Sequence, residues 1–462
     1  MATSDTDEHF DVVIVGARCA GSPLAIFLKR AGLSVCVIDQ AGFPSDSLST
    51  HMFQISGIEV MRKLGIFDAV LATGAPPVTT CSMQFEDVDF SGPPRLREGD
   101  ANVPMLCVRR ISLDVILVEK AREEGVDVRL HTRLTGLVEK NGRVAGVRIA
   151  ARDGHPSTIS ADLVVGADGR LSTVARLVGS RRYHVLPSER LSTWSYFRGA
   201  PREPESRLFY HRRGDEFIVA APTDDDLFLV ASCPSVEQSP AYRADGEAAF
   251  NRALATCEPL ADLLAGAKRV NKFRGLTRFE GYFREAMGPG WVLVGDSGHF
   301  KEPTPGQGIS DALRQVEKLS AAIARGFGSA ERLDAELRRW WRWRDKDSIQ
   351  HYWFCFDVGR RGPISPVRLE LLRIVAADEE WRKDFLDIFM HRMYPRKVLG
   401  PAALAAATAH ALANPAKRPG ALGDAYDIVR EDVRRRLAAW FPRSTERAAV
   451  DEPHLDHQPS AA

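Results

Sequence analysis

The chain has 462 residues, of which 44% are hydrophobic and 27% are charged, and its formal net charge is +1. This length exceeds that of one small domain, and the composition is ordinary for a globular enzyme. The near-zero net charge argues against nucleic acid as a partner, and because no run of about 18 apolar residues occurs, we expect no stable membrane insertion.

The cysteines and the N-terminus bear on the compartment. Seven cysteines are scattered along the chain, and no two have C-x-x-C spacing. An odd number of unclustered cysteines argues against a disulfide framework or a zinc site and fits a reducing compartment. Residues 1–9 are polar and acidic, unlike a secretory signal. We therefore predict a cytoplasmic protein without a metal site.

The first elements form a βαβ unit. The apolar run 11–15 predicts a buried strand that Gly16 ends, and residues 22–30 have a helical pattern. Residues 33–38 predict a second buried strand, closed by Asp39. Because parallel strands need a crossover helix, this unit indicates an α/β fold.

A glycine-rich motif lies between the first strand and the helix. It follows the dinucleotide fingerprint G-x-G-x-x-G, except that Arg18 replaces the middle glycine. The start of the helix offers N–H groups to a pyrophosphate, and the Arg18 guanidinium either folds over the phosphates or points into solvent. Asp39 is placed to bind ribose hydroxyls and to disfavour a 2′-phosphate. The motif therefore predicts an FAD or NAD site made of Gly16, Ala17, Arg18, Cys19, Ala20, Gly21 and Asp39.

The rest of the chain alternates helices and strands before it becomes helical. From about 191 to 233, short aromatic and β-branched segments predict an inserted antiparallel sheet, and after Ile309 the pattern is mostly helical. Asn141-Gly142 predicts a hairpin turn. The expected helices are 55–71, 113–123 and 402–413, and the expected strands are 126–130, 135–138, 144–150, 163–165, 193–197, 207–211, 217–220, 227–231 and 291–294.

Two further motifs follow buried strands. They are Gly166-Ala167-Asp168-Gly169-Arg170 and Gly295-Asp296-Ser297-Gly298-His299, the second followed by Pro303-Thr304-Pro305-Gly306-Gln307-Gly308. With the first motif, and across residues 10–325, they make the chain similar to the para-hydroxybenzoate hydroxylase-like flavoprotein family. That family includes aromatic hydroxylases, geranylgeranyl reductases and flavin-dependent halogenases. The motifs are specific for the family, but not for one reaction.

The resemblance implies an FAD site and a domain plan. Asp39 would bind the adenosine ribose, Asp296 the ribityl O3′, and the helix that begins near Gly308 would lie beside the isoalloxazine ring. The further FAD contacts it implies are Arg110, Leu134, Asp168, Gly295, Asp296, Pro303, Gly306, Gln307 and Gly308. We expect an α/β, Rossmann-like FAD-binding domain at 10–185 and 270–325, an inserted antiparallel-sheet substrate domain at 186–269, a helical C-terminal extension at 326–442 and a disordered tail at 443–462.

The resemblance also implies a reaction. The hydroxylases of the family reduce FAD with NADH or NADPH and form a flavin hydroperoxide with O2. We therefore expect a monooxygenase that hydroxylates or epoxidises a hydrophobic or aromatic small molecule, with no universal catalytic residue. A reductase of the geranylgeranyl-reductase type stays open, and a non-catalytic redox sensor is a third alternative. The absence of a W-x-W-x-I-P segment argues against a halogenase.

The substrate would lie between the inserted sheet and the flavin ring. Packing in the core is the alternative for each aromatic candidate, and His51 could contact the flavin, attach to it covalently, or be an ordinary buried histidine. The candidates are His51, Trp194, Tyr196, Tyr210, Phe217 and His299. The basic–aromatic run 338–344 is flanked by acidic residues, so inward-packed tryptophans with outward arginines are favoured there over membrane or nucleic-acid contact. The C-terminal helices could also form a homodimer contact.

Overall fold

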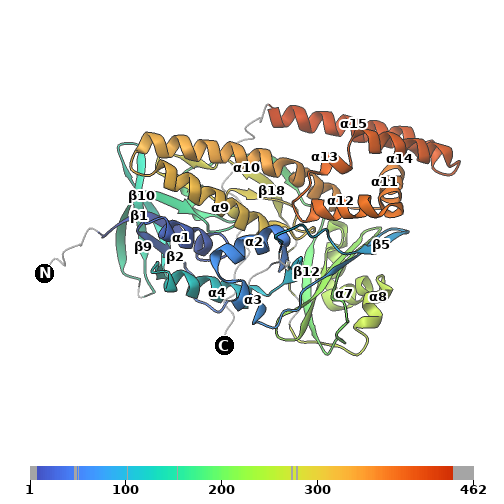
Figure 1. Ribbon diagram of the computed structural model, residues 1–462, viewed down its shortest axis with the longest axis horizontal. Coiled ribbons are helices and arrows are strands. Elements are labelled where there is room, and N and C mark those ends of the chain that lie inside the picture. Colours follow the sequence, from blue (N-terminus) through green and yellow to red (C-terminus); the bar gives the residue numbers. More distant parts are fainter. Residues whose placement is uncertain are drawn as a thin grey trace.

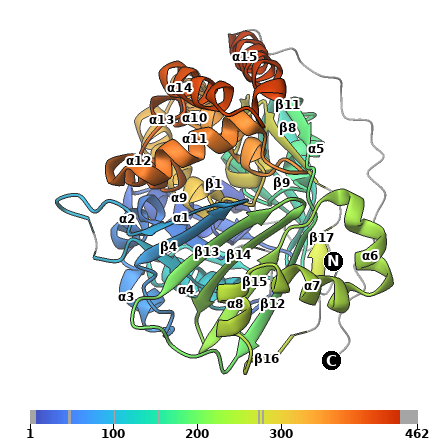
Figure 2. The same ribbon diagram turned by 90° about the vertical axis from the view of Figure 1, so that its right-hand side faces the viewer.

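The computed structural model describes residues 8–45, 49, 51–100, 102–152, 154–271, 274–276 and 279–440. Two large β-sheets, each packed against helices, make up most of it (Figures 1 and 2). The expected tail from residue 443 lies outside these residues. Among the helices they form, we find none with the length and apolar content that a bilayer span requires.

The first sheet contains the predicted βαβ unit. Its strands are β1 (Glu8–Val15), β2 (Val35–Ile38), β7 (Asp127–Arg129), β8 (Arg133–Lys140), β9 (Arg143–Ala150), β10 (Pro156–Gly166), β19 (Met287–Gly288) and β20 (Trp291–Leu293). The order is β19–β20–β10–β1–β2–β7, and the β8–β9 hairpin joins through β10. The predicted hairpin turn is confirmed, because Asn141 and Gly142 both have positive φ, 53° and 72°. Because β2, β1, β10 and β20 pair in parallel, their carboxyl ends meet at one edge.

Alternate residues of β1 face two different cores, as expected of a strand covered on both faces. Val12 and Ile14 pack with α1 (Gly21–Arg30), α2 (Ile55–Leu64), α4 (Arg110–Glu123) and α9 (Gly308–Gly326). Val13 and Val15 pack with the β8–β9 hairpin and α5 (Thr173–Leu177). The expected helix 55–71 is broken, because Gly65 ends α2 with φ +74° and a short α3 (Phe67–Leu71) follows.

The second sheet carries the expected inserted strands and others besides. Its strands are β4 (Thr80–Phe85), β5 (Val88–Gly92), β12 (Ser192–Arg198), β13 (Arg207–Arg213), β14 (Glu216–Thr223), β15 (Leu227–Ser232), β16 (Lys268–Arg269) and β17 (Arg274–Leu276). All its pairs are antiparallel except β4–β13, which is parallel. Since β4 and β5 precede the segment 186–269, the sheet is not built from that segment alone, and the domain boundaries stay a prediction.

Helices cover both faces of the second sheet. One face packs against α6 (Ser239–Ala244), α7 (Gly246–Ala255) and α8 (Glu258–Leu263), of which α7 and α8 lie in front of the sheet in Figure 2. The other face packs against α10 (Ala330–Val358), α11 (Pro366–Ala377) and α12 (Glu379–Phe389). There are also two small sheets among the described residues. One pairs β3 (Met52–Gln54) with β6 (Met105–Cys107), and the other contains β11 (Arg182–Pro187), β18 (Glu280–Arg284) and β21 (His299–Phe300).

The C-terminal region is helical, as expected. The long helix α10 runs beside α9, and α13 (Pro395–Val398), α14 (Pro401–Ala413) and α15 (Arg418–Trp440) follow α12 (Figure 1). Of the basic–aromatic run, Trp340 packs inward and donates its indole N–H to the Gln315 carbonyl at 3.2 Å. The expectation that the arginines point outward is wrong for Arg344, which is fully buried because it donates to the carbonyls of Gly298 and Arg284.

Candidate active site

The three glycine-containing motifs meet at the carboxyl edge of the first sheet. The N–H of Gly16 donates to the Ile38 carbonyl at 2.8 Å, and the N–H of Ala167 donates to the Val15 carbonyl at 2.8 Å. The N–H of Val294, next to the third motif, donates to the Gly166 carbonyl at 3.0 Å. Motifs almost 300 residues apart in the sequence are therefore held together by backbone hydrogen bonds.

Glycine is needed where the motifs touch. Gly16 has φ +105°, and a Cβ placed on it would lie 2.4 Å from the carbonyl oxygen of Ala167. A Cβ on Gly21 would lie 1.7 Å from the Gly16 oxygen, closer than any packing allows. Gly295 has φ +64°, and its Cβ would lie 3.1 Å from that of Ala20. The first motif is thus pressed against both of the others.

The Asp39 side chain holds the loop of the first glycine-containing motif by hydrogen bonds. Its two carboxylate oxygens accept the N–H groups of Ala17 and Ala41, each at 2.8 Å. Its backbone carbonyl accepts the N–H of Thr132 at 2.8 Å, which places the start of β8, with Leu134, beside this loop. Each carboxylate oxygen keeps a further lone pair, so the group can still accept from a ribose hydroxyl.

Side chains from other segments hold Arg18, so it does not lie free in solvent. Its guanidinium donates to Asp114 at 2.8 Å and to the Ser45 hydroxyl at 2.9 Å. Arg110 donates to the same carboxylate through Nε at 2.9 Å and through a terminal nitrogen at 3.0 Å. Two guanidiniums therefore share the fully buried Asp114 beside the start of α1. Asp114 was not among the predicted site residues, although its spacing of four residues from Arg110 on a helix is a usable signal.

The Asp168 carboxylate accepts hydrogen bonds from the first turn of α5. It accepts the N–H groups of Thr173 at 2.7 Å and Val174 at 3.1 Å, and the Ser172 hydroxyl at 2.5 Å. Burial raises the pKa of Asp168, and these hydrogen bonds oppose the rise. Asp168 is thus beside Gly16, as the motif order implied, while its carboxylate caps α5.

Asp296 is the carboxylate of the third motif. It lies in the turn 295–297 with a partly exposed side chain, and its backbone carbonyl accepts the Tyr282 hydroxyl at 2.6 Å. Burial raises its pKa to about 6, although the positive charges of Arg110 and Arg170 oppose the rise. Asp296 and Arg110 therefore lie close enough to interact electrostatically.

The loop 303–308 is fixed from both sides. Its Gly306 carbonyl accepts the Gln54 amide at 2.7 Å, and its Pro305 carbonyl accepts the Tyr210 hydroxyl at 2.7 Å. Gln307 turns its side chain away toward α12. Gly308, the first residue of α9, is exposed, and a Cβ on it would have no protein atom within 4 Å. Gly308 therefore faces open space at the start of α9, where a helix presents N–H groups and its positive end.

His51 and Tyr196 connect the segment before β3 to β12 of the second sheet. The His51 Nε2 lies 2.6 Å from the Tyr196 hydroxyl, and the His51 backbone has φ 57°, unusual for a residue other than glycine. Burial, with the positive charge of Arg110 next in size, lowers the pKa of His51 to about 3. Thr50, beside it, lies outside the described residues. The pair is therefore neutral and buried between β12 and the segment before β3.

The other aromatic substrate candidates are Trp194, which lies near Tyr196 on β12, and Tyr210 and Phe217, which lie in the core. Trp194 is on the same face of β12 as Tyr196 and is buried. Tyr210 and Phe217 pack in the same cluster, where Tyr210 lies 5.1 Å from the ring of Phe389 in α12. The structure favours core packing for these two.

His299 also lies in a packed environment. Its ring centroid is 4.3 Å from that of Phe283. Burial lowers its pKa well below the ordinary value, and the side chain is 4% exposed. The contacts favour packing over substrate binding for His299.

The residues present fit an FAD molecule. The start of α1 supplies N–H groups for a pyrophosphate, Arg18 and Arg110 supply positive charge beside it, and Gly308 leaves space beside the start of α9. Asp39 and Asp296 supply acceptors at two separated points. Which residue contacts which part of FAD stays a prediction.

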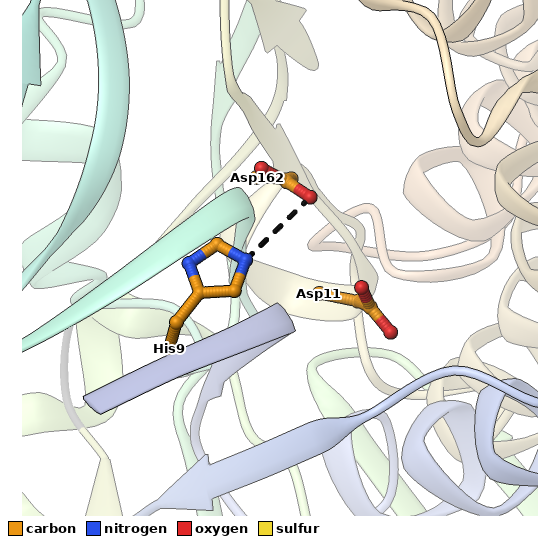
Figure 3. Close-up of side chains that lie close together, drawn as sticks. All are labelled: His9, Asp11 and Asp162. Carbon is orange, nitrogen blue, oxygen red and sulfur yellow. Dashed lines mark ion pairs between the residues drawn. The ribbon is translucent and has the colours of Figure 1, made fainter. Parts of the chain in front are cut away.

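A separate group of possible metal ligands lies at the amino end of β1, away from this edge. It consists of His9, Asp11 and Asp162, with His9 Nε2 3.8 Å from Asp162 (Figure 3). His9 and Asp162 are exposed, and Asp11 accepts the N–H of Ser34 at 2.6 Å. We attach no function to this group.

The family is shown by a match over most of the chain. Residues 9–338 match the family model described as FAD binding domain. The chain therefore belongs to this family, as the motifs indicated, and is an FAD-dependent oxidoreductase with the expected α/β fold and helical C-terminal portion.

Individual relatives carry out different reactions. A 1H-pyrrole-2-carbonyl-(peptidyl-carrier protein) brominase of Pseudoalteromonas luteoviolacea is 23% identical, over 68% of this chain and 77% of the relative. A 6-methylpretetramide 4-monooxygenase of Streptomyces rimosus is 26% identical, over 69% and 76%. A digeranylgeranylglycerophospholipid reductase 2 of Methanothermobacter thermautotrophicus is 26% identical, over 73% and 84%.

Solved structures show the same fold. The flavin-dependent brominase Bmp2 has a TM-score of 0.69 at 19% identity, over 87% of this chain and 98% of that one. A flavoprotein/dehydrogenase from Cytophaga hutchinsonii has a TM-score of 0.72 at 16% identity, over 86% and 98%. At such identities the likeness concerns the fold and not the reaction.

Proposed function

We propose that this chain is an NAD(P)H-dependent flavin monooxygenase that hydroxylates or epoxidises a hydrophobic or aromatic small molecule. The observation that carries the proposal is the contact between His51 and Tyr196, with Trp194 on the same face of β12 as Tyr196. Within the described residues, His51 Nδ1 and Trp194 Nε1 are buried without a hydrogen-bond partner. Buried polar groups are normally paired, so a small molecule with an apolar body and a polar group is the expected occupant.

The chain's own residues would do three things for this reaction. Bound FAD would accept electrons from NADH or NADPH and pass them to O2. The start of α1, with Arg18 and Arg110, would hold the pyrophosphate, and Asp296 the ribityl chain. The apolar face of β12, backed by α10 and α12, would keep water away from the substrate.

His51 would orient the substrate. Because its pKa is about 3, the ring is neutral, so one nitrogen donates and the other accepts. When Nε2 accepts the Tyr196 hydroxyl, Nδ1 carries the proton and can donate to a substrate oxygen. When Nε2 instead donates to the Tyr196 oxygen, Nδ1 carries no proton and can accept a hydrogen bond from the substrate. The hydrogen bond with Tyr196 therefore determines whether Nδ1 is a donor or an acceptor.

The proposal is tested with purified protein and candidate aromatic substrates. We expect a yellow protein in which substrate accelerates NADH or NADPH oxidation, and a product that contains oxygen from isotope-labelled O2. Oxygen that comes from labelled water, or turnover that persists without O2, contradicts a monooxygenase. Comparing the two nicotinamide cofactors decides which of them is used.

Halogenation is a second candidate, because a brominase is among the relatives and among the similar folds. The missing W-x-W-x-I-P segment stands against it. Product that carries bromine or chlorine, and forms only when the halide is present, would establish it. A reductase, as in the relative from Methanothermobacter, would turn over without O2. A cytoplasmic location and a homodimer stay proposals beside these.

A further inference from the structure

A buried cluster of charged side chains joins the first turn of α9 to the segment that follows α12. The Lys301 Nζ lies 2.5 Å from Asp311 Oδ2 and 2.6 Å from the Gln307 side-chain oxygen. The His391 Nδ1 lies 2.7 Å from Asp311 Oδ1. The side chains of Lys301, Asp311 and His391 are each no more than 5% exposed. Asp311 therefore has one partner before α9 and one from beyond α12.

The second nitrogen of His391 also faces a carboxylate. Its Nε2 lies 3.3 Å from Asp347 Oδ2, and Arg314 donates to the other oxygen of Asp347 at 2.9 Å. His391 therefore lies between two carboxylates, in a hydrogen bond with Asp311 and close to Asp347. The His351 ring stacks on His391 at 3.6 Å, and burial lowers the pKa of His351 well below its ordinary value, so His351 stays neutral.

The same segment holds the loop in front of α9. The Gln307 amide donates to the carbonyls of Ile388 at 2.9 Å and Phe389 at 3.0 Å, at the end of α12. Residues 388–391 therefore contact both Gln307 and Asp311 (the area between α9 and α12 in Figure 1). The family match ends at residue 338, so this contact comes from a part of the chain that the family model does not include.

We propose that His391 is a positioning residue for the flavin site, which rests on the proposed function. A carboxylate in the first turn of α9 opposes the positive helix end that would face the flavin. Lys301 and His391 together offset the Asp311 charge, and with Gln307 they fix the turn against α12. The C-terminal helices thereby set both the position and the charge of the α9 start.

Three variants separate charge from hydrogen bonding. His391→Gln keeps a donor for Asp311 but cannot carry a positive charge, so we expect FAD to bind at least about fivefold more weakly and its midpoint potential to fall. Asp311→Asn removes the negative charge, so the potential should rise. The double variant leaves Lys301 as the unbalanced charge, and its potential should return toward the wild-type value. His410→Gln, on the exposed side of α14, is the matched control.

The experiment measures FAD affinity of flavin-free protein, the midpoint potential of the loaded protein and the thermal unfolding of both. A potential in His391→Gln equal to that of wild type and His410→Gln overturns the proposal. A lowered potential that the double variant fails to recover also overturns it. If His391→Gln does not fold, Asp311→Asn decides: a higher potential supports the proposal, and an unchanged or lower one overturns it. Wild-type protein that binds no FAD refutes the proposed function instead.

Discussion

The open space at Gly308 gives a sharp test of where the flavin lies. Gly308→Ala adds one methyl group where no protein atom lies within 4 Å and where the glycine has no positive φ. In flavin-free protein the change should therefore stabilise the fold by up to about 1 kcal/mol, because alanine favours helix over glycine. If the isoalloxazine ring packs against this backbone, the methyl overlaps it. Overpacking of about 1–3 kcal/mol corresponds to roughly 5- to 150-fold weaker FAD binding.

The matched control is Gly420→Ala. Gly420 is near the start of α15, is exposed, and also has no atom within 4 Å of a placed Cβ. Both variants should keep or raise the melting temperature of flavin-free protein, while only Gly308→Ala should weaken FAD binding in a fluorescence titration. Equal FAD affinities in the two variants would refute the placement of the ring beside Gly308.

Three further predictions follow from the site. Gly16→Ala places a Cβ 2.4 Å from the Ala167 oxygen on a backbone with φ +105°. It should therefore lower the free energy of unfolding, measured with urea, by about 2–4 kcal/mol. An unchanged urea midpoint would contradict the close contact. Tyr210→Phe leaves the Pro305 carbonyl without its buried donor, so it should lower the free energy of unfolding by about 1–3 kcal/mol. A variant as stable as wild type would contradict this role of the hydroxyl. The pKa of Asp296 is about 6 in the folded state, above its ordinary value of 3.8, so the folded state binds a proton more readily than the unfolded state. As pH rises from about 4 to 6, the free energy of unfolding of flavin-free wild type should therefore fall relative to that of Asp296→Asn. Parallel pH curves for the two proteins would show that Asp296 is not perturbed.

The parts of the fold that the sequence predicts depend on local patterns. The apolar run 12–15 and the helix that follows are recognisable because a buried parallel strand and a crossover helix differ in composition and period. Given those strands, parallel pairing brings Gly16, Asp168 and Asp296 to one edge without further information. The motif order was therefore sufficient to predict the convergence of the three segments.

The parts that failed depend on partners distant in sequence. Nothing local in β4 states that it will pair in parallel with β13, more than 120 residues later. Arg344 has the composition of a surface residue, and only the carbonyls of Gly298 and Arg284 explain its burial. Gln307 stays a predicted FAD contact, but the sequence did not indicate that its side-chain amide donates to two carbonyls of α12, which lies outside the recognised motifs.

The claim on which the account depends is that the three motifs form one FAD site. Titration of flavin-free protein with FAD, followed by acid precipitation, tests it most directly. We expect saturation at one FAD per chain, a yellow complex, and release of all the flavin into the supernatant. Protein that stays colourless and binds no FAD would contradict the account, and flavin that remains with the precipitate would contradict noncovalent binding.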